Sequence, residues 1–155
     1  MLSTKQIISI FGKAGDDRNL ITVTMPYSRR IAWDLKALTN KMQCHKLVAP
    51  LFQKIHAEIL EHYGIEEIKR LEIDIFGGCY NFRKMRGGSD WSRHSWGIAE
   101  DLNPIKNGLK IKADKAQFAK KEYRTMMDIY YANGFINQGV EKGFDFMHFE
   151  FNEFK

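Results

Sequence analysis

DWSRHSWGIAEDLNP, residues 90–104, places a histidine, His94, seven residues before an aspartate, Asp101. A second stretch near the C-terminus, FDFMHFEF at residues 144–151, contains His148. Two imidazoles and one carboxylate form a three-ligand set typical of catalytic zinc, which keeps a fourth position for water or substrate, whereas structural zinc usually has four protein ligands. We therefore predict a catalytic zinc site at His94, Asp101 and His148.

The spacing within each stretch constrains the local backbone. Seven residues are nearly two helical turns, so a helix would put His94 and Asp101 on one face, but Trp-Gly-Ile at residues 96–98 disfavours a helix. Asp145 and His148 are three apart and would face opposite sides of a regular strand. If both serve one site, the chain must kink between them. We predict that Asp145 ends a loop and that His148 begins the strand.

The combined pattern, Ser-x-His-x-x-Gly-x-Ala-x-Asp from Ser92 followed by Asp-x-x-His from Asp145, resembles the zinc D-alanyl-D-alanine carboxypeptidase and L-alanyl-D-glutamate endopeptidase family. This family includes phage endolysins and vancomycin-resistance dipeptidases, and the resemblance extends from about residue 11 to the C-terminus. It implies a single zinc peptidase domain over residues 1–155 that acts on peptidoglycan stem peptides. It also implies that a strand, a tight connection and a second strand bring the first two ligands together.

The resemblance also suggests roles for residues around the metal. Asp145 matches the acidic base of the family, although an aspartate with an ordinary pKa of about 3.9 is a weak base and needs help from burial or from zinc. Arg83 matches an arginine upstream of the Ser-x-His motif and would stabilise the oxyanion. Arg86 is the alternative. Ser92 would either bind substrate or orient the surroundings of His94.

Other residues near the motifs have two interpretations. Glu150 follows His148 by two residues, so it shares a strand face with this ligand and would support it or assist proton transfer; the alternative is a solvent-facing side chain. Trp91 and Trp96 flank His94 and would either wall a cleft or pack in the core. The ligands themselves have a plainer interpretation, in which the histidines are hydrogen-bonded core residues and Asp101 serves a turn.

Composition limits the remaining choices. The 155 residues suit one domain, the net charge of +5 favours anionic partners, and the lysines and arginines are dispersed enough to form an ordinary solvated surface. Cys44 and Cys79 are expected to be free thiols. No apolar run reaches the roughly 20 residues of a membrane span, and the N-terminal apolar run is short for a signal peptide. We expect a monomer that is made in the cytoplasm and reaches the cell wall after release.

Hydrophobic patterning predicts an α+β fold in which a small antiparallel sheet carries the zinc site and packs with two to three main helices. His56 and His62 would be surface or boundary residues of a helix that Gly64 ends. The composition near Ile31 favours another helix. The expected strands are 6–11, 20–25, 71–76 and 144–151, the expected helices are 45–63 and 113–133, and 79–88 is a loop.

The leading functional hypothesis is a zinc-dependent peptidase that cuts stem-peptide amide bonds next to D-amino acids, as an endolysin-type L-alanyl-D-glutamate endopeptidase. One alternative is a D,D-carboxypeptidase or dipeptidase, which removes a terminal residue. Another is a zinc-stabilised binding module without catalysis. Nucleic acid is not an expected partner, because the chain has no zinc-finger spacing and no aromatic RNA-binding motif.

Overall fold

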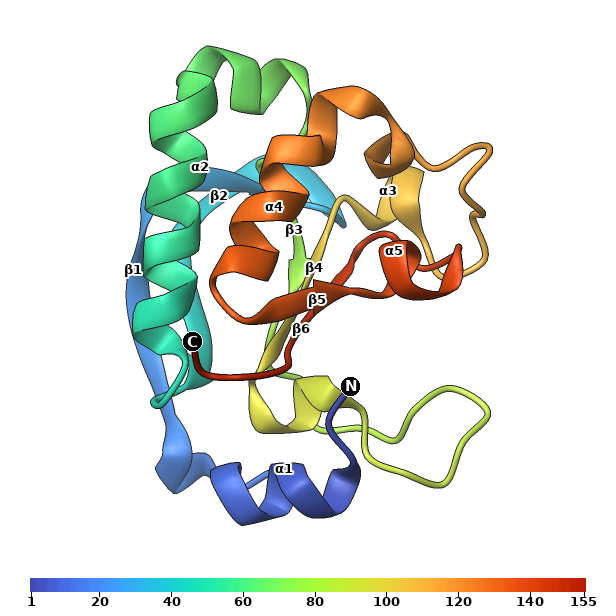
Figure 1. The fold of residues 1–155 in the computed structure, drawn as a ribbon. Helices are drawn as coiled ribbons and strands as arrows, with labels where there is room; N and C mark the ends of the chain where they lie inside the picture. The colour runs from blue at the N-terminus through green and yellow to red at the C-terminus, as the bar shows by residue number, and fades with distance from the viewer.

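The computed structural model describes residues 1–155, which form one six-stranded mixed sheet with helices around it (Figure 1). Neighbouring strands follow the order β2-β1-β3-β4-β6-β5, and every pair is antiparallel except β1 with β3. The prediction of an α+β fold is confirmed, with one parallel pair in the sheet. The strands are β1 Leu20–Ile31, β2 Asp34–His45, β3 Ile75–Gly78, β4 Ala99–Leu102, β5 Phe135–Asn137 and β6 His148–Phe151.

The long helix α2 packs against β1 and α4, whereas α1 lies at the far end of the molecule near the N-terminus (Figure 1). No helix combines the length and the apolar character that crossing a membrane requires. The α-helices are α1 Thr4–Phe11, α2 Ala49–Arg70, α3 Pro104–Asn107, α4 Arg124–Ala132 and α5 Gln138–Lys142. The 3₁₀ helices are η1 Asp17–Asn19, η2 Arg93–Trp96, η3 Gln117–Ala119 and η4 Lys121–Tyr123.

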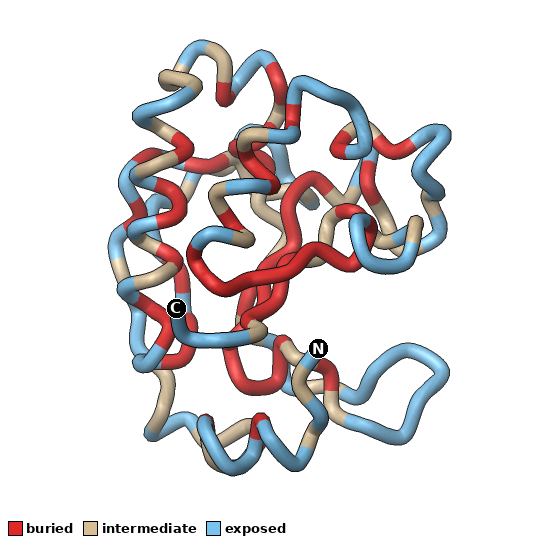
Figure 2. Tube along the Cα trace, in the orientation of Figure 1, coloured by how far each residue is buried: buried red, intermediate tan, exposed pale blue.

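The core lies between the central strands and the helices α2 and α4. Phe52 and Ile59 of α2, Tyr130 of α4 and Phe149 of β6 are fully buried members of this core. The ring of Tyr130 stacks on Phe149 at a centroid distance of 3.9 Å. Figure 2 shows that β4, β5 and β6 are buried over most of their length. The strands that carry the predicted ligands are therefore held by the core on one face.

The N-terminal segment departs from the prediction. Residues 6–11 belong to the helix α1 and not to a strand, because Ser3 and Gln6 form a capping box and the buried Ile7 and Phe11 lie four apart on one helical face. The strand expected at 20–25 is confirmed within β1. The strand β1 continues to Ile31 and pairs with β2, which begins at Asp34. The expected helical segment near Ile31 is therefore wrong.

The helix expected at 45–63 is confirmed within α2, although His45 ends β2 instead of starting the helix. Gly64 has φ 75° and ψ 158° and interrupts α2, which then continues to Arg70. The interpretation of His56 as a surface or boundary residue is wrong, because its side chain is fully buried. His62 is exposed, as expected.

Two other boundaries also shift. The strand expected at 71–76 begins only at Ile75, because a turn around Glu72, which has φ 60°, precedes it. Only the second half of the helix expected at 113–133 is an α-helix, α4. Two 3₁₀ helices, η3 and η4, replace its first half. The buried side chains of this segment still form part of the core, as the apolar stripe predicts: Ala116, Phe118, Tyr123, Met126, Met127 and Tyr130.

Candidate active site

His94 lies in the 3₁₀ turn η2, between two residues that shape the turn. The hydroxyl of Ser92 accepts a hydrogen bond from the His94 amide, and Gly97 leaves the turn with a φ of 69°. The His94 Nδ1 atom lies 2.6 Å from the carbonyl oxygen of Cys79. A carbonyl can only accept, so Nδ1 carries the hydrogen and the Nε2 lone pair faces the cavity. The first half of the predicted strand–connection–strand arrangement is thus a 3₁₀ turn.

Asp101 and His148 come from neighbouring antiparallel strands. They are directly paired in the register of β4 with β6, which brings their side chains together on one face of the sheet. The His148 Nδ1 atom lies 3.2 Å from Asp101 Oδ1, and the His94 Nε2 atom lies 3.2 Å from Asp101 Oδ2. The second contact is too poorly aligned for a hydrogen bond, so His94 Nε2 is a buried nitrogen without a hydrogen-bond partner.

The opposite nitrogen of His148, Nε2, lies 3.3 Å from Glu150 Oε1. Glu150 is buried and also accepts a hydrogen bond from Gln138, so its carboxylate is held in place beside the ring. Metal-bound histidines usually donate their second N–H to a carboxylate or a carbonyl, and here Glu150 and Cys79 provide one of each. Glu150 does not face solvent, contrary to the plainer interpretation of the sequence.

The three side chains fit a zinc ion. One donor atom each from His94, Asp101 and His148 lie within 4.8 Å of one another, which is a span that one ion can bridge. The unpartnered His94 Nε2 supports this fit, because a buried nitrogen without a hydrogen bond is otherwise unfavourable. A pair of imidazole nitrogens with one carboxylate is also a donor set that zinc accepts in catalytic sites.

Charge interactions among the three candidate ligands are strong. Burial disfavours the charged form of Asp101, but the two histidines outweigh this effect and hold its pKa well below the usual range. Burial also disfavours the His148 cation, yet Asp101 and Glu150 raise its pKa to about 10. The carboxylates of Asp101 and Glu150 therefore favour a positive charge at the position of His148.

Asp145 stands at the kink that the sequence predicts. It has a φ of 67° and precedes β6, which begins at His148, and the His148 amide donates to the Asp145 carbonyl at 3.2 Å. Its Oδ1 atom is buried without a hydrogen-bond partner. Burial raises the pKa of Asp145, and the charge of Asp101 adds to this increase, whereas His148 and His94 lower the pKa. The carboxylate is thus available to accept a proton.

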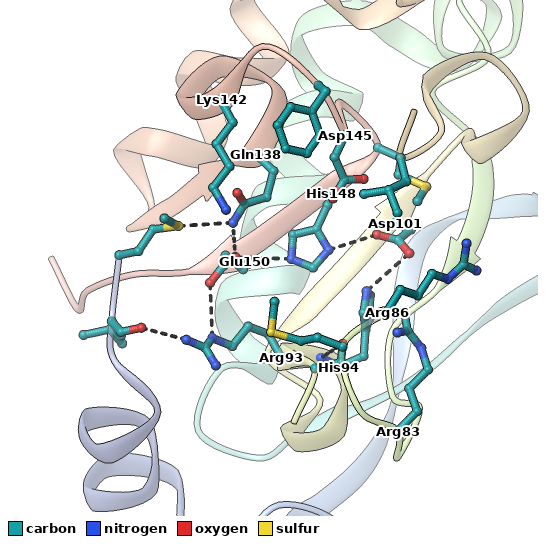
Figure 3. Close-up of a pocket in the computed structure, with 17 residues that line it drawn as sticks. Arg83, Arg86, Arg93, His94, Asp101, Gln138, Lys142, Asp145, His148 and Glu150 are labelled. Carbon is teal, nitrogen blue, oxygen red and sulfur yellow. Dashed lines mark hydrogen bonds and ion pairs between the residues drawn. The ribbon is translucent and has the colours of Figure 1, made fainter. Parts of the chain in front are cut away.

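A cavity of about 480 Å³ opens over these groups (Figure 3). Arg83 and Arg86 lie on one side of the ligand set in Figure 3, and Lys142 lies on the other. None of these three cations forms an ion pair within the protein; the Arg83 guanidinium donates to the Lys84 carbonyl. Ser92 also lines the cavity. The two candidates for the oxyanion donor, Arg83 and Arg86, therefore both line the cavity.

A sequence model of the D-alanyl-D-alanine carboxypeptidase family matches residues 86–151, a segment that contains His94, Asp101, Asp145 and His148. The segment that carries the site is similar to this family. The chain therefore carries the site of a zinc metallopeptidase. No curated protein and no solved structure gives a significant match to the chain.

The tryptophans of this peptidase lie in different surroundings. Trp96 is buried, and its Nε1 atom donates to the Gly12 carbonyl at 2.8 Å, so it packs in the core. Trp91 stacks on Phe82 at 4.4 Å beneath the ammonium of Lys84. Trp91 is not one of the cavity-lining residues, and these contacts place it in the loop beside the cavity.

Several cavity residues of the peptidase escaped the sequence analysis. Arg93 lies 3.6 Å from Glu150 and donates to the Leu2 carbonyl at 2.9 Å, which ties the N-terminal segment to the site. Gln138 and Lys142 reach the cavity from α5. Of these residues, only Arg93 could have been identified from the sequence, because it directly precedes His94. The others come from elements whose proximity depends on the folded sheet.

A buried polar cluster supports β4 from the side opposite to the peptidase ligands. Glu100, next to Asp101, accepts hydrogen bonds from Arg29 at 3.0 Å and from Tyr130 at 2.5 Å, and it lies 2.7 Å from His56 Nε2. Burial disfavours the charged form of Glu100, but His56 and Arg29 outweigh this effect and lower its pKa to about 2. The strand that carries Asp101 is thus anchored by charged and hydrogen-bonded groups in the core.

Proposed function

We propose that the protein is a zinc-dependent peptidase that hydrolyses stem-peptide amide bonds next to D-amino acids in peptidoglycan. The observation that carries this proposal is the convergence of His94 Nε2, Asp101 and His148 Nδ1 beside an unpartnered Asp145 oxygen in one cavity. A plain structural cluster would not need two buried polar atoms without hydrogen-bond partners, His94 Nε2 and Asp145 Oδ1, at the same place.

His94, Asp101 and His148 would hold the ion. Zinc in such a site supplies Lewis acidity, which polarises the scissile carbonyl and lowers the pKa of water. Asp145 accepts the proton that the attacking water loses and returns it to the amide nitrogen as the carbon–nitrogen bond breaks. The Arg83 guanidinium donates to the oxyanion of the tetrahedral intermediate, with Arg86 as the alternative. Glu150 and the Cys79 carbonyl hold the two imidazoles in the required orientation.

The bond that is cut distinguishes two forms of this proposal. The resemblance to phage endolysins supports an L-alanyl-D-glutamate endopeptidase, and cations on both sides of the ligand set would accommodate carboxylates on either side of an internal bond. The description of the matching family supports a D,D-carboxypeptidase instead. An endopeptidase needs room on both sides of the scissile bond, whereas a carboxypeptidase must hold a terminal carboxylate on one side.

Mass spectrometry of purified peptidoglycan and defined muropeptides after incubation with the zinc-loaded protein tests the proposal. Release of stem peptides cut between L-alanine and D-glutamate would identify the endopeptidase, and loss of a terminal D-alanine would identify the carboxypeptidase. A chelator should abolish either product. Asp145→Asn should keep zinc and lose about 10²–10⁴ in kcat, which is the usual contribution of a general base. A folded, zinc-bound protein that cuts no wall type would contradict an enzymatic role and leave a binding module.

A further inference from the structure

The positive charge of the chain is concentrated in one segment, residues 106–124, which we call the basic arm. This segment contains seven lysines and arginines but only two acidic residues, so its net charge of +5 equals that of the whole chain. All the remaining residues together are neutral. The cations are therefore not evenly dispersed, and the prediction of a dispersed basic surface is wrong for the basic arm.

Six cations of the basic arm are exposed and form no ion pair. Lys106 is the exception, because it pairs with Glu72. The six unpaired residues are Lys110, Lys112, Lys115, Lys120, Lys121 and Arg124. Unpaired charges of like sign repel one another. A polyanion that approaches them therefore gains interaction energy without breaking internal contacts.

The basic arm is an ordered structure and not a loose tail. The buried Phe118 anchors its centre, and the Phe118 amide donates to Asn107 Oδ1 at 2.7 Å. The buried Ala116 adds a second anchor, because its amide donates to the Lys112 carbonyl at 2.8 Å. The anchors hold the backbone while the lysine side chains point into solvent. The charges are therefore presented on a fixed scaffold.

The basic arm also lies beside the cavity. Leu109 lines the cavity, and the Ala113 amide donates to the Gly143 carbonyl at 3.1 Å. Lys112 forms a β-bridge with Phe144, which immediately precedes Asp145. Figure 1 shows the arm as the yellow-to-orange segment next to α5. A polymer held on the basic arm would thus be held within reach of the site.

We propose that the basic arm is an exosite that binds an anionic polymer of the cell envelope. The six cations are spread over fifteen residues and do not converge on one pocket, which suits repeated charges along a polymer better than a single small anion. The choice of an envelope polymer rests on the proposed function. Its charges are the phosphates that repeat along polymers attached to the wall, because a regular series of anions matches cations spread over fifteen residues.

The test compares two triple variants of the full, zinc-loaded chain with equal charge change. Lys110→Gln/Lys115→Gln/Lys121→Gln removes cations of the basic arm. The control replaces three exposed lysines that also lack ion pairs and lie elsewhere: Lys5→Gln/Lys36→Gln/Lys69→Gln. Binding to insoluble cell walls is measured by sedimentation over a range of salt concentrations, on intact walls and on walls stripped of phosphate polymers. Turnover of a short soluble muropeptide is measured in parallel.

The arm variant should bind intact walls about tenfold more weakly than wild type, and the slope of log affinity against log salt should fall by about two. The control variant should bind like wild type. Turnover of the muropeptide should be unchanged in both, and this readout tests the proposed function separately. Binding should be lost on stripped walls, and retained binding there would overturn the choice of phosphates. Equal losses in both variants, or tighter binding to an oligonucleotide than to any wall, would overturn the proposal.

Discussion

Each histidine of the candidate site has a partner on one side of its ring, which leaves the other ring nitrogen to face Asp101. The Cys79 carbonyl takes the Nδ1 hydrogen of His94, and Glu150 faces Nε2 of His148. The two rings thus present different nitrogens, Nε2 from His94 and Nδ1 from His148, to the same point. The contribution of such partners to metal binding is usually large, because they orient the ring and raise its basicity.

Glu150→Gln should therefore weaken zinc binding about 10–100-fold, since an amide accepts the His148 hydrogen less strongly than a carboxylate does. The measurement is a competition titration with a zinc-binding dye. Glu153→Gln is the matched control, because this glutamate is exposed and its contact is with Lys155. Unchanged zinc affinity in Glu150→Gln would show that Glu150 serves the structure only.

Arg83→Ala should lower kcat about 10²–10³-fold with a small change in KM, as removal of an oxyanion donor does. Both side chains line the cavity. Arg86→Ala should have the smaller effect, because the family resemblance assigns the oxyanion role to Arg83. Steady-state kinetics on a defined muropeptide separates the two. If the order of the effects is reversed, Arg86 is the oxyanion donor.

At the scale of elements, the site depends on how β4 and η2 are held. The polar cluster of Glu100, His56 and Arg29 anchors β4 in the core, and Gly97 joins η2 to β4 in a left-handed conformation. Neither feature touches the cavity. Both act on the positions of His94 and Asp101 through the backbone.

Tyr130→Phe should lower the free energy of unfolding by about 1–3 kcal/mol, because it removes a donor from the buried Glu100 carboxylate and leaves that charge less well compensated. Urea denaturation followed by circular dichroism measures the change. Tyr80→Phe is the control, since the Tyr80 hydroxyl forms no hydrogen bond within the protein and its removal should change stability by less than about 0.5 kcal/mol. Equal stability of the two variants would argue against the cluster as a stabilising anchor.

Gly97→Ala should be more destabilising than Gly87→Ala, although the two glycines have nearly the same φ, 69° and 71°. The left-handed conformation costs alanine about 1–2 kcal/mol at either position. At Gly97 the added Cβ would also lie 2.7 Å from the backbone nitrogen of His45, whereas at Gly87 it meets nothing within 4 Å. Thermal unfolding and zinc affinity of both variants check this. The prediction fails if the two substitutions cost the same.

At the scale of the whole molecule, the metal should link two halves of the chain. His94 and Asp101 are contributed by the middle of the sequence, and His148 comes from its C-terminal strand. An ion bound by all three stabilises the folded state, because the unfolded chain does not bring them together.

Zinc at 100 times its dissociation constant should raise the free energy of unfolding by about 2.7 kcal/mol, and a chelator should remove this gain. Thermal unfolding with and without zinc measures the effect. Asp145→Asn should show the same zinc-dependent shift, because Asp145 is not a ligand, and His94→Ala should show a much smaller shift. A full shift in His94→Ala would mean that zinc binds elsewhere.

The sequence alone determined the features that depend on local spacing. The separation of three residues from Asp145 to His148 required a kink, and the positive φ of Asp145 supplies it. The apolar period of residues 48–63 predicted most of α2, because one buried face is enough to specify a helix. The motifs likewise identified the three side chains that the fold brings together, and their binding of zinc stays a prediction.

The tertiary structure decided what depends on residues far apart in the chain. The ring nitrogens that face the cavity depend on Cys79 and Glu150, and the burial of His56 depends on contacts with Tyr27 and Glu100. The basic arm lies beside the cavity because the Ala113 amide donates a hydrogen bond to the Gly143 carbonyl, in the segment that precedes Asp145. The strand β2 escaped prediction because its apolar pattern is weak and its pairing with β1 stabilises it. Strand pairing is stabilised by contacts that form only in the assembled sheet. A local window of sequence does not contain both partners of these contacts.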